Sequence, residues 1–319
     1  MTDAASPIAP PRLAVILPCY NEEAAIAKTV QDFRAALPDA KIYVYDNNSK
    51  DRTVAVAQDA GAIVRTEPRQ GKGNVMRRMF ADVEADIYVL ADGDDTYDAA
   101  QAPELVRKLI AEELDLVTGR RIHTRADAYR AGHVWGNKML TGLTALMFDI
   151  ELKDMLSGYR IMSRRFVKSF PFTAAGFAIE TELTVHAVRL LMPMAEVDSA
   201  YKERPAGSAS KLNTYRDGFR ILFAIAKLIR EERPLFFFSS IAALLAILSA
   251  ILAWPLFVEY YQTGLVPRFP TALLATGLMI VAFLSLTSGL ILDTVTRGRW
   301  EAKRMAYLAL RGPRDRRNS

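Results

Sequence analysis

The chain has 319 residues, a hydrophobic content of 51% and a formal net charge of +5, with a sequence pI near 9.2. Its single cysteine, Cys19, excludes an internal disulfide, and its three scattered histidines do not give a zinc-binding spacing. The basic balance does not indicate nucleic-acid binding, because the residues after Leu292 carry eight basic and three acidic side chains and account for the whole net charge.

The amino-terminal two thirds of the chain alternate between two kinds of pattern. Residues 1–11 contain three prolines and no apolar run of the kind found in secretory signals, so we expect a disordered tail. From Leu13 onwards, short apolar runs are followed by segments with helical spacing. The expected strands are 13–17, 42–45, 62–65, 87–91 and 116–118, and the expected helices are 22–37, 51–60, 74–83 and 102–113. This order predicts an α/β fold with a mostly parallel sheet, in which ligands bind beyond the carboxyl ends of the strands.

Two stretches without charge follow, at 234–258 and 269–292, and each exceeds the roughly 20 apolar residues that span a bilayer core. The short connection between them contains Gly264 and Pro267, so the sequence predicts a transmembrane hairpin with both outer ends on one side. Basic residues flank those outer ends, whereas the connection carries only Arg268. The positive-inside rule therefore puts both termini in the cytoplasm, at an inner or plasma membrane. A buried helical pair of a soluble protein is the alternative.

The segments on either side of the hairpin are rich in basic residues. In 213–233, aromatic and leucine side chains are interleaved with arginine and lysine, which predicts an interfacial amphipathic helix leading into the first span. The tail 293–319 is expected to contact anionic lipid head groups. Both features would place the preceding domain beside the bilayer.

The sequence Asp92-Gly93-Asp94-Asp95 directly follows the apolar run 87–91, so it is predicted to lie at the end of a buried strand. Carboxylate oxygens crowded in one loop suit a hard divalent cation such as Mg²⁺, which tends to share its ligand shell with substrate phosphates. We therefore predict a metal site for a diphosphate, with Asp92 and Asp94 as ligands. A polar turn without a ligand is the alternative.

Three further motifs precede this one: Pro18-Cys19-Tyr20-Asn21-Glu22-Glu23 after the first strand, Asp46 after the second, and Gly71-Lys72-Gly73. In this order the motifs resemble those of glycosyltransferase family 2, which has the GT-A fold. The resemblance implies a catalytic domain over residues 12–212, with the nucleoside held by the first loop and Asp46, and the diphosphate held through Mg²⁺ or Mn²⁺. The residues expected to contact the nucleotide sugar are Pro18, Tyr20, Asn21, Glu22, Asp46, Lys72 and Asp92. For Tyr20 and Asp46, ordinary turn chemistry is the alternative.

A later segment, Asp154-Met155-Leu156-Ser157-Gly158-Tyr159-Arg160, resembles the corresponding part of polyprenyl-phosphate sugar transferases, the group that includes dolichyl-phosphate mannose synthase and bactoprenol glucosyltransferases. Segment 119–137 resembles the mobile acceptor loop of this group, and a following amphipathic segment, 134–148, could lie on the membrane or pack onto the core. Guanidinium groups suit phosphate oxygens, with surface salt bridges as the alternative. The residues expected to meet the acceptor phosphate are Arg120, Arg121, Arg204, Ser210 and Lys211.

The resemblance implies inverting transfer of one sugar from a nucleotide sugar, with a UDP-sugar preferred, to undecaprenyl or dolichyl phosphate. Asp94, Asp154 and Arg160 are the expected catalytic residues. Asp154 would act as a base or an orienting carboxylate, because the acceptor phosphate is already anionic.

Two alternatives remain open. A polysaccharide synthase would carry a Gln-x-x-Arg-Trp motif, but Thr296 stands where the glutamine is expected. A catalytically silent scaffold would bind the nucleotide sugar without turning it over. The sequence also leaves open the identity of the sugar and whether the chain forms a homo-oligomer.

Overall fold

A computed structural model describes residues 10–123, 153–171, 179–202 and 229–312, together with positions 142, 226 and 227. The chain divides into two compact units, one formed by Met1–Gly218 with Lys303–Ser319 and the other by Phe219–Ala302. Residues 1–9 of the predicted tail, the segment 134–148 except position 142, and most of 213–233 lie outside the described residues.

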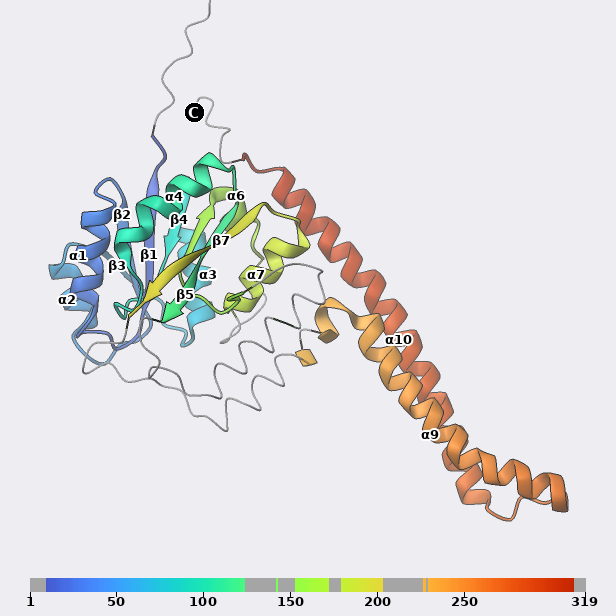
Figure 1. Cartoon of the computed structure of the whole chain (residues 1–319). Helices are drawn as coiled ribbons and strands as arrows, with labels where there is room; N and C mark the ends of the chain where they lie inside the picture. The colour runs from blue at the N-terminus through green and yellow to red at the C-terminus, as the bar shows by residue number, and fades with distance from the viewer. Residues whose placement is uncertain are drawn as a thin grey trace, which may run out of the picture. The chain divides into compact units, whose positions relative to one another are not determined.

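The first unit is built on a seven-stranded sheet with the order β3-β2-β1-β4-β6-β5-β7 (Figure 1). Its strands are β1 Leu13–Cys19, β2 Lys41–Asp46, β3 Ile63–Thr66, β4 Ile87–Leu90, β5 Leu116–His123, β6 Arg160–Ser163 and β7 Met194–Tyr201. Among the strands of the described residues, only β6 runs antiparallel to both of its neighbours. The predicted α/β fold with a mostly parallel sheet is confirmed, while β6 and β7 were not anticipated.

Helices cover both faces of this sheet. They are α1 Ile26–Ala36, α2 Thr53–Asp59, α3 Lys72–Asp82, α4 Ala102–Ala111 with a 3-10 turn Ala99–Gln101 before it, α6 Arg164–Ser169 and α7 Ile179–Arg189. One buried core contains Phe33 and Leu105 on one face, and a second contains Met76 and Leu183 on the other. Helix α1 begins later than predicted, because the carbonyl of Glu22 accepts from the amides of two following residues in a turn. The carboxyl ends of β1, β2 and β4 lie together on one side of these layers, at the carboxyl edge of the sheet.

At the opposite edge, where the parallel strands begin, the carboxylate of Asp115 is buried just before β5. It accepts from Ser163 Oγ at 2.6 Å, from Arg165 Nε at 2.6 Å and from the Tyr307 hydroxyl at 2.7 Å. The Arg165 guanidinium lies over the Tyr307 ring, 4.8 Å from its centroid. The end of the last helix is therefore packed into the first unit, as the division of the chain also indicates.

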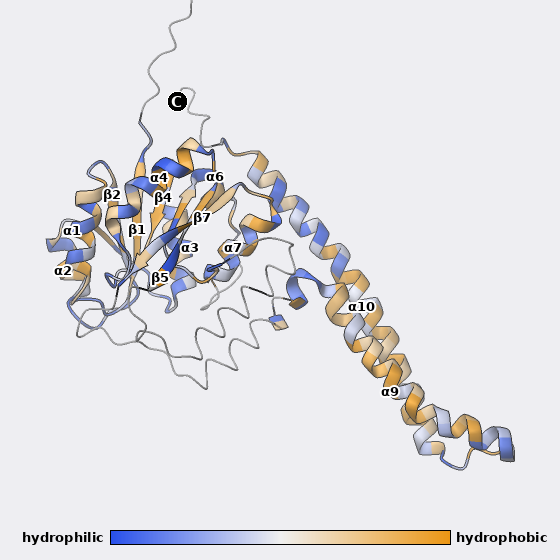
Figure 2. Cartoon of the chain, viewed as in Figure 1, coloured by the Kyte–Doolittle hydropathy of each residue, from blue (hydrophilic) through white to orange (hydrophobic). Residues whose placement is uncertain are grey.

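The second unit contains most of the helical hairpin formed by α9, Pro234–Thr263, and α10, Phe269–Leu308 (Figure 2). Both helices are long and apolar enough to cross a membrane by length and composition, and both extend beyond the predicted spans. Ser249 Oγ donates to the Ala275 carbonyl at 2.7 Å, and Ser285 Oγ donates to the Phe238 carbonyl at 3.0 Å. Hydrogen bonds of this kind are common between membrane helices.

Large apolar side chains of the hairpin point outwards. Trp254 is 71% exposed and Phe283 is 65% exposed. Many other large apolar side chains along both helices are also exposed. Apolar surface of this extent is unfavourable in water, whereas lipid covers it without cost. The hairpin is thus suited to membrane association.

Candidate active site

The loops after β1 and β2 are bound to each other at the carboxyl edge of the sheet. The amide of Asn21 donates to Ser49 Oγ, its side-chain oxygen accepts from the Lys50 amide, and the Glu22 amide donates to Thr53 Oγ1, all at 2.8 Å. Asp46, at the end of β2, is buried and accepts from the Ser49 amide at 3.2 Å. Glu22, Asn21 and Asp46 are therefore brought together, as their predicted role in binding a nucleoside requires.

Three of the five described non-glycine residues with positive φ lie in these loops. Asn21, Asn48 and Asp95 have φ values of 53°, 64° and 56° in the loops after β1, β2 and β4, whereas Glu113 and Leu191 lie elsewhere. Left-handed backbone at residues other than glycine is costly and is often found at functional sites. Pro18 is buried within β1, and Tyr20 beyond it is partly exposed.

Asn47 is a buried residue of this edge that sequence reasoning did not select. Its side-chain amide donates to the carbonyls of Glu67 at 2.9 Å and Arg69 at 2.8 Å, and its side-chain oxygen accepts from the Gly71 amide at 2.7 Å. These three bonds hold the loop that leads into α3, where Lys72 is the first residue. Its position in the polar turn after β2 was the only available signal.

Lys72 forms two short ion pairs. Its Nζ lies 2.6 Å from Asp92 Oδ1 and 2.6 Å from Glu180 Oε1 on α7. Burial by itself would lower the pKa of Lys72, but the two carboxylates outweigh it and raise the pKa above its ordinary value. The ammonium is therefore charged at any physiological pH. Glu180 was not selected from the sequence, because nothing near it signals that it meets Lys72.

The loop that contains Asp92 and Asp94 is packed closely on its neighbours. A Cβ on Gly158 would lie 2.7 Å from Asp92 Oδ2, and a Cβ on Gly93 would lie 2.3 Å from Cys19 Sγ. Neither position can hold a larger residue without movement. Asp94 is buried, with Oδ1 accepting from Thr96 Oγ1 at 2.6 Å. The loop is thus fixed between β1 and the 153–158 segment.

Asp92 and Asp94 supply the oxygen ligands that a hard divalent cation prefers. Among the described residues, however, no group of three or more histidine, cysteine, aspartate or glutamate side chains could hold a metal ion. A cation held by these two carboxylates would need water and phosphate oxygens as its remaining ligands, which is the usual arrangement for Mg²⁺ beside a phosphorylated substrate.

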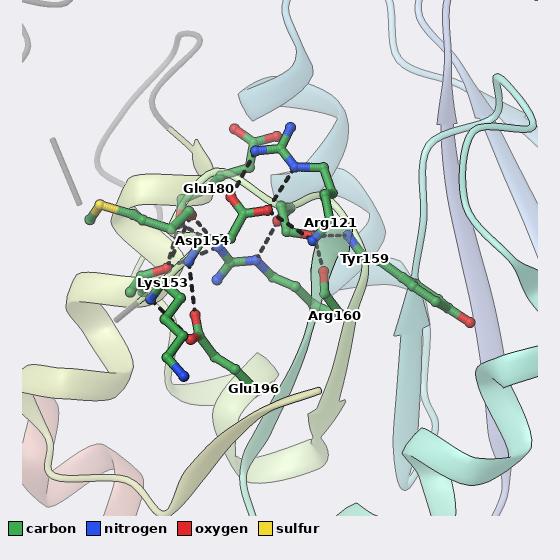
Figure 3. Close-up of polar contacts among 12 residues, drawn as sticks. Arg121, Lys153, Asp154, Tyr159, Arg160, Glu180 and Glu196 are labelled. Atoms are coloured by element: carbon green, nitrogen blue, oxygen red, sulfur yellow. Dashed lines mark hydrogen bonds and ion pairs between the residues drawn. The ribbon is translucent and has the colours of Figure 1, made fainter. Parts of the chain in front are cut away.

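Asp154 lies in a cluster with Arg121 and Glu196 (Figure 3). Arg121 donates to Asp154 from both Nε and Nη2 at 2.7 Å, and its amide donates at 3.2 Å. Glu196 on β7 accepts from the amides of Lys153 at 3.0 Å and Asp154 at 3.1 Å. A bidentate arginine fixes the direction of this carboxylate, which suits an orienting role.

Arg160 is fully buried at the start of β6. It donates to the carbonyls of Ser157 at 3.0 Å, Met155 at 2.7 Å and Glu180 at 3.0 Å. Burial lowers its pKa to about 10, so the side chain stays charged near neutral pH. In this structure it connects the 153–158 loop to α7. Its expected catalytic role remains a prediction.

Arg120 and Arg121 lie on a strand. The predicted acceptor loop 119–137 is wrong in its first part, because β5 continues to His123 by pairing along its whole length with β7. Arg120 forms an ion pair with Asp198, its partner in the register of the two strands. The other predicted acceptor residues, Arg204, Ser210 and Lys211, lie outside the described part of the chain.

The chain resembles known proteins in sequence and in structure. The family Glycosyl transferase family 2 matches residues 14–170. Glycosyltransferase AglJ of Haloferax volcanii is 32% identical over 234 residues, which cover 73% of this chain and 77% of that protein. The chain belongs to glycosyltransferase family 2, and it is a glycosyltransferase.

Two further similarities are informative. A dolichyl-phosphate hexose transferase of Haloferax volcanii is 29% identical over 221 residues, which cover 69% of this chain and 95% of that protein. The structure of glucosyl-3-phosphoglycerate synthase from Mycobacterium tuberculosis with Mn²⁺ and uridine-diphosphate-glucose is similar with a TM-score of 0.54 and 26% identity, covering 69% of this chain and 78% of that one. The predicted GT-A fold is confirmed.

Proposed function

We propose that this glycosyltransferase transfers a single sugar from a nucleotide sugar to a membrane polyprenyl phosphate and releases a nucleoside diphosphate. The observation that carries the proposal is that two charged clusters meet at one edge of the sheet. Lys72 pairs with Asp92, Arg121 pairs with Asp154, and Gly158 from the loop that begins at Asp154 packs on Asp92. One cluster could bind the diphosphate of a donor and the other an anionic acceptor.

The proposed donor is a UDP-sugar. The similar synthase from Mycobacterium tuberculosis, whose structure holds Mn²⁺ and uridine-diphosphate-glucose, supports this choice. Pro18, Tyr20, Asn21, Glu22 and Asp46 would surround the nucleoside. Lys72 would contact the diphosphate, and Asp92 with Asp94 would hold Mg²⁺ or Mn²⁺ against it.

The proposed acceptor is undecaprenyl or dolichyl phosphate. The name of the related dolichyl-phosphate hexose transferase and the two apolar helices support a lipid acceptor. Its phosphate would be met by Arg120, Arg121, Arg204, Ser210 and Lys211. With both spans in an inner or plasma membrane, the basic residues near the outer helix ends would place the catalytic domain and both termini in the cytoplasm.

The proposed reaction is a single in-line displacement with inversion. An anionic oxygen of the acceptor phosphate forms a bond to the anomeric carbon while the bond from that carbon to the diphosphate breaks, and the diphosphate takes the electron pair. Asp154, fixed by Arg121, would orient the acceptor, and Lys72 would attract the leaving diphosphate. A bound Mg²⁺ or Mn²⁺ supplies charge stabilisation to that leaving group.

The test is a nucleotide-release assay on the purified full chain in detergent, scanning UDP- and GDP-sugars with and without undecaprenyl phosphate and metal. We expect release of nucleoside diphosphate that requires both the lipid and the metal. Release that is equally fast without lipid would contradict the polyprenyl acceptor. No release with any donor would favour the catalytically silent scaffold.

A further inference from the structure

Lys72 pairs with one oxygen of a carboxylate that a metal ion would need. Its Nζ is 2.6 Å from Asp92 Oδ1 and equally close to Glu180 Oε1. The side chains of Lys72 and Asp92 are 30% and 29% exposed, so the pair lies at the surface of the edge where a ligand can reach it. An internal cation therefore already neutralises one of the two predicted metal ligands.

We propose that Lys72 blocks Asp92 against a divalent cation until the diphosphate of a donor draws the ammonium away, so that metal and nucleotide bind together. The inference rests on the proposed function, because it takes a donor with a diphosphate. It assigns to Lys72 a role beyond contact with the phosphates: it makes metal binding conditional on the donor.

The chemistry of the three side chains supports this exchange. A lysine is a compact charge on a flexible stem, so its ammonium can move between nearby anions without any change in the backbone. Glu180 would offer the ammonium a second partner when Asp92 turns to the metal, and its side chain is only 12% exposed. Two like charges at the same carboxylate repel strongly in a partly buried site. Metal and ammonium would therefore exclude each other at Asp92.

The donor would reverse that exclusion. A diphosphate attracts the ammonium and also supplies oxygen ligands to the metal. The described residues lack a group of three carboxylate, histidine or cysteine ligands, so those additional oxygens would matter for affinity. Coupling of this kind is reciprocal: the nucleotide must raise the affinity for metal by the same factor as the metal raises the affinity for nucleotide.

The test measures Mn²⁺ binding to the purified full chain in detergent by the electron paramagnetic resonance signal of free Mn²⁺, with and without UDP. Sugar and lipid are absent, so the readout does not depend on turnover. For the wild type we expect weak binding without UDP and binding about tenfold tighter with it. For Lys72→Met we expect binding without UDP to become about tenfold tighter and the effect of UDP to shrink.

Two further variants separate the exchange from a general effect of charge. Lys108→Met neutralises a lysine of α4 that pairs with Glu112, outside the loop of Asp92 and Asp94, and it should leave the Mn²⁺ affinity unchanged. Glu180→Gln leaves the ammonium with Asp92 as its remaining partner, so Mn²⁺ binding without UDP should weaken. Lys72→Met and Glu180→Gln are thus expected to shift the affinity in opposite directions.

Wild-type Mn²⁺ affinity in Lys72→Met without UDP would overturn the inference and leave the proposed function intact. Absence of Mn²⁺ binding by the wild type even with UDP would contradict the metal site of the proposed function as well. If a melting curve shows that Lys72→Met does not fold, Glu180→Gln and the charge-preserving Lys72→Arg test the inference in its place. An unchanged affinity in Glu180→Gln, or coupling lost in Lys72→Arg, would then overturn the inference.

Discussion

The parallel half of the sheet, β3-β2-β1-β4, and the mixed half, β6-β5-β7, present charged side chains at the same edge but hold them differently. In the parallel half, hydrogen bonds accepted by Asn21 and Asn47 fix the loops, and Asp92 meets a flexible lysine at the surface. In the mixed half, Arg121 is bidentate on Asp154, and Arg160 is buried among carbonyls. The parallel half therefore has the more exchangeable charges.

This difference fits two kinds of ligand. A donor diphosphate with its metal can displace one lysine, whereas an acceptor phosphate would have to share arginines that already have carboxylate partners. The proposed donor side should therefore be sensitive to single changes of charge, and the proposed acceptor side should be sensitive to changes in orientation. The following variants test that distinction.

The largest effect is expected for Asp94→Ala. Removing this buried carboxylate takes away a proposed metal ligand, so turnover should fall roughly a thousandfold. The measurement is the rate of nucleoside diphosphate release, with the melting temperature as a check that the protein stays folded. A folded variant with the wild-type rate would contradict the metal assignment on the parallel half.

A smaller loss is expected for Asp154→Asn on the mixed half. The amide keeps the shape of the side chain but cannot accept the bidentate ion pair from Arg121, so the orientation of both groups should loosen. We expect kcat to fall roughly a hundredfold while KM for the nucleotide sugar stays within about twofold. A rise in donor KM of the same size as the loss of kcat would show that the two halves are not separate in function.

Asn47→Ala tests whether Asn47 holds the loop before Lys72 in place in the parallel half. Its side chain makes three buried hydrogen bonds to the loop before Lys72, and their loss should lower the free energy of unfolding by about 1–3 kcal/mol. The donor KM should rise, because Lys72 would no longer be held in place. Asn74→Ala is the matched control, since Asn74 makes an exposed bond to the same loop. Equal effects of the two variants would contradict the role of Asn47.

The pH dependence of stability tests the packing around His186 in the mixed half. Burial between Phe166 and Phe170 lowers its pKa to about 3. The unfolded state therefore binds a proton between about pH 6.5 and 3 that the folded state does not, and stability falls as the pH drops through this window, by roughly 1.4 kcal/mol per pH unit at most. Above the ordinary pKa of histidine the contribution is fully present. In His186→Gln, denaturant unfolding should show a shallower slope below pH 6.5, and an unchanged slope would contradict the assignment.

The parallel half could be predicted well from the sequence, because its elements are local. Each apolar run from Leu13 to Leu90 is followed along the chain by its own helix, so the order of strands and helices along the chain and the positions of Asp46 and Asp92 after their strands follow from short-range patterns. The loop geometry that brings Asn47 to Gly71 depends on side-chain contacts, and no periodicity reports those.

The mixed half could not be predicted in the same way. Strand β6 has four residues, and it starts with an arginine and ends with a serine, so it lacks an apolar run. Arg120 and Arg121 were assigned to a loop because their strand depends on β7, which is far along the chain and contains Glu196 and Asp198. The meeting of Lys72 with Glu180 likewise depends on the packing of α3 and α7 into the same buried core. Long-range pairing decides these features, and a single sequence does not reveal it.

The most direct test of the central claim is the mass of the lipid product. The purified full chain would be incubated with undecaprenyl phosphate, Mn²⁺ and the donor that supports nucleotide release, and the extracted lipid would be analysed by mass spectrometry. The account predicts undecaprenyl phosphate carrying one sugar, formed by the wild type and lost in Asp94→Ala. A lipid carrying a chain of sugars, or sugar transferred to water alone, would contradict it.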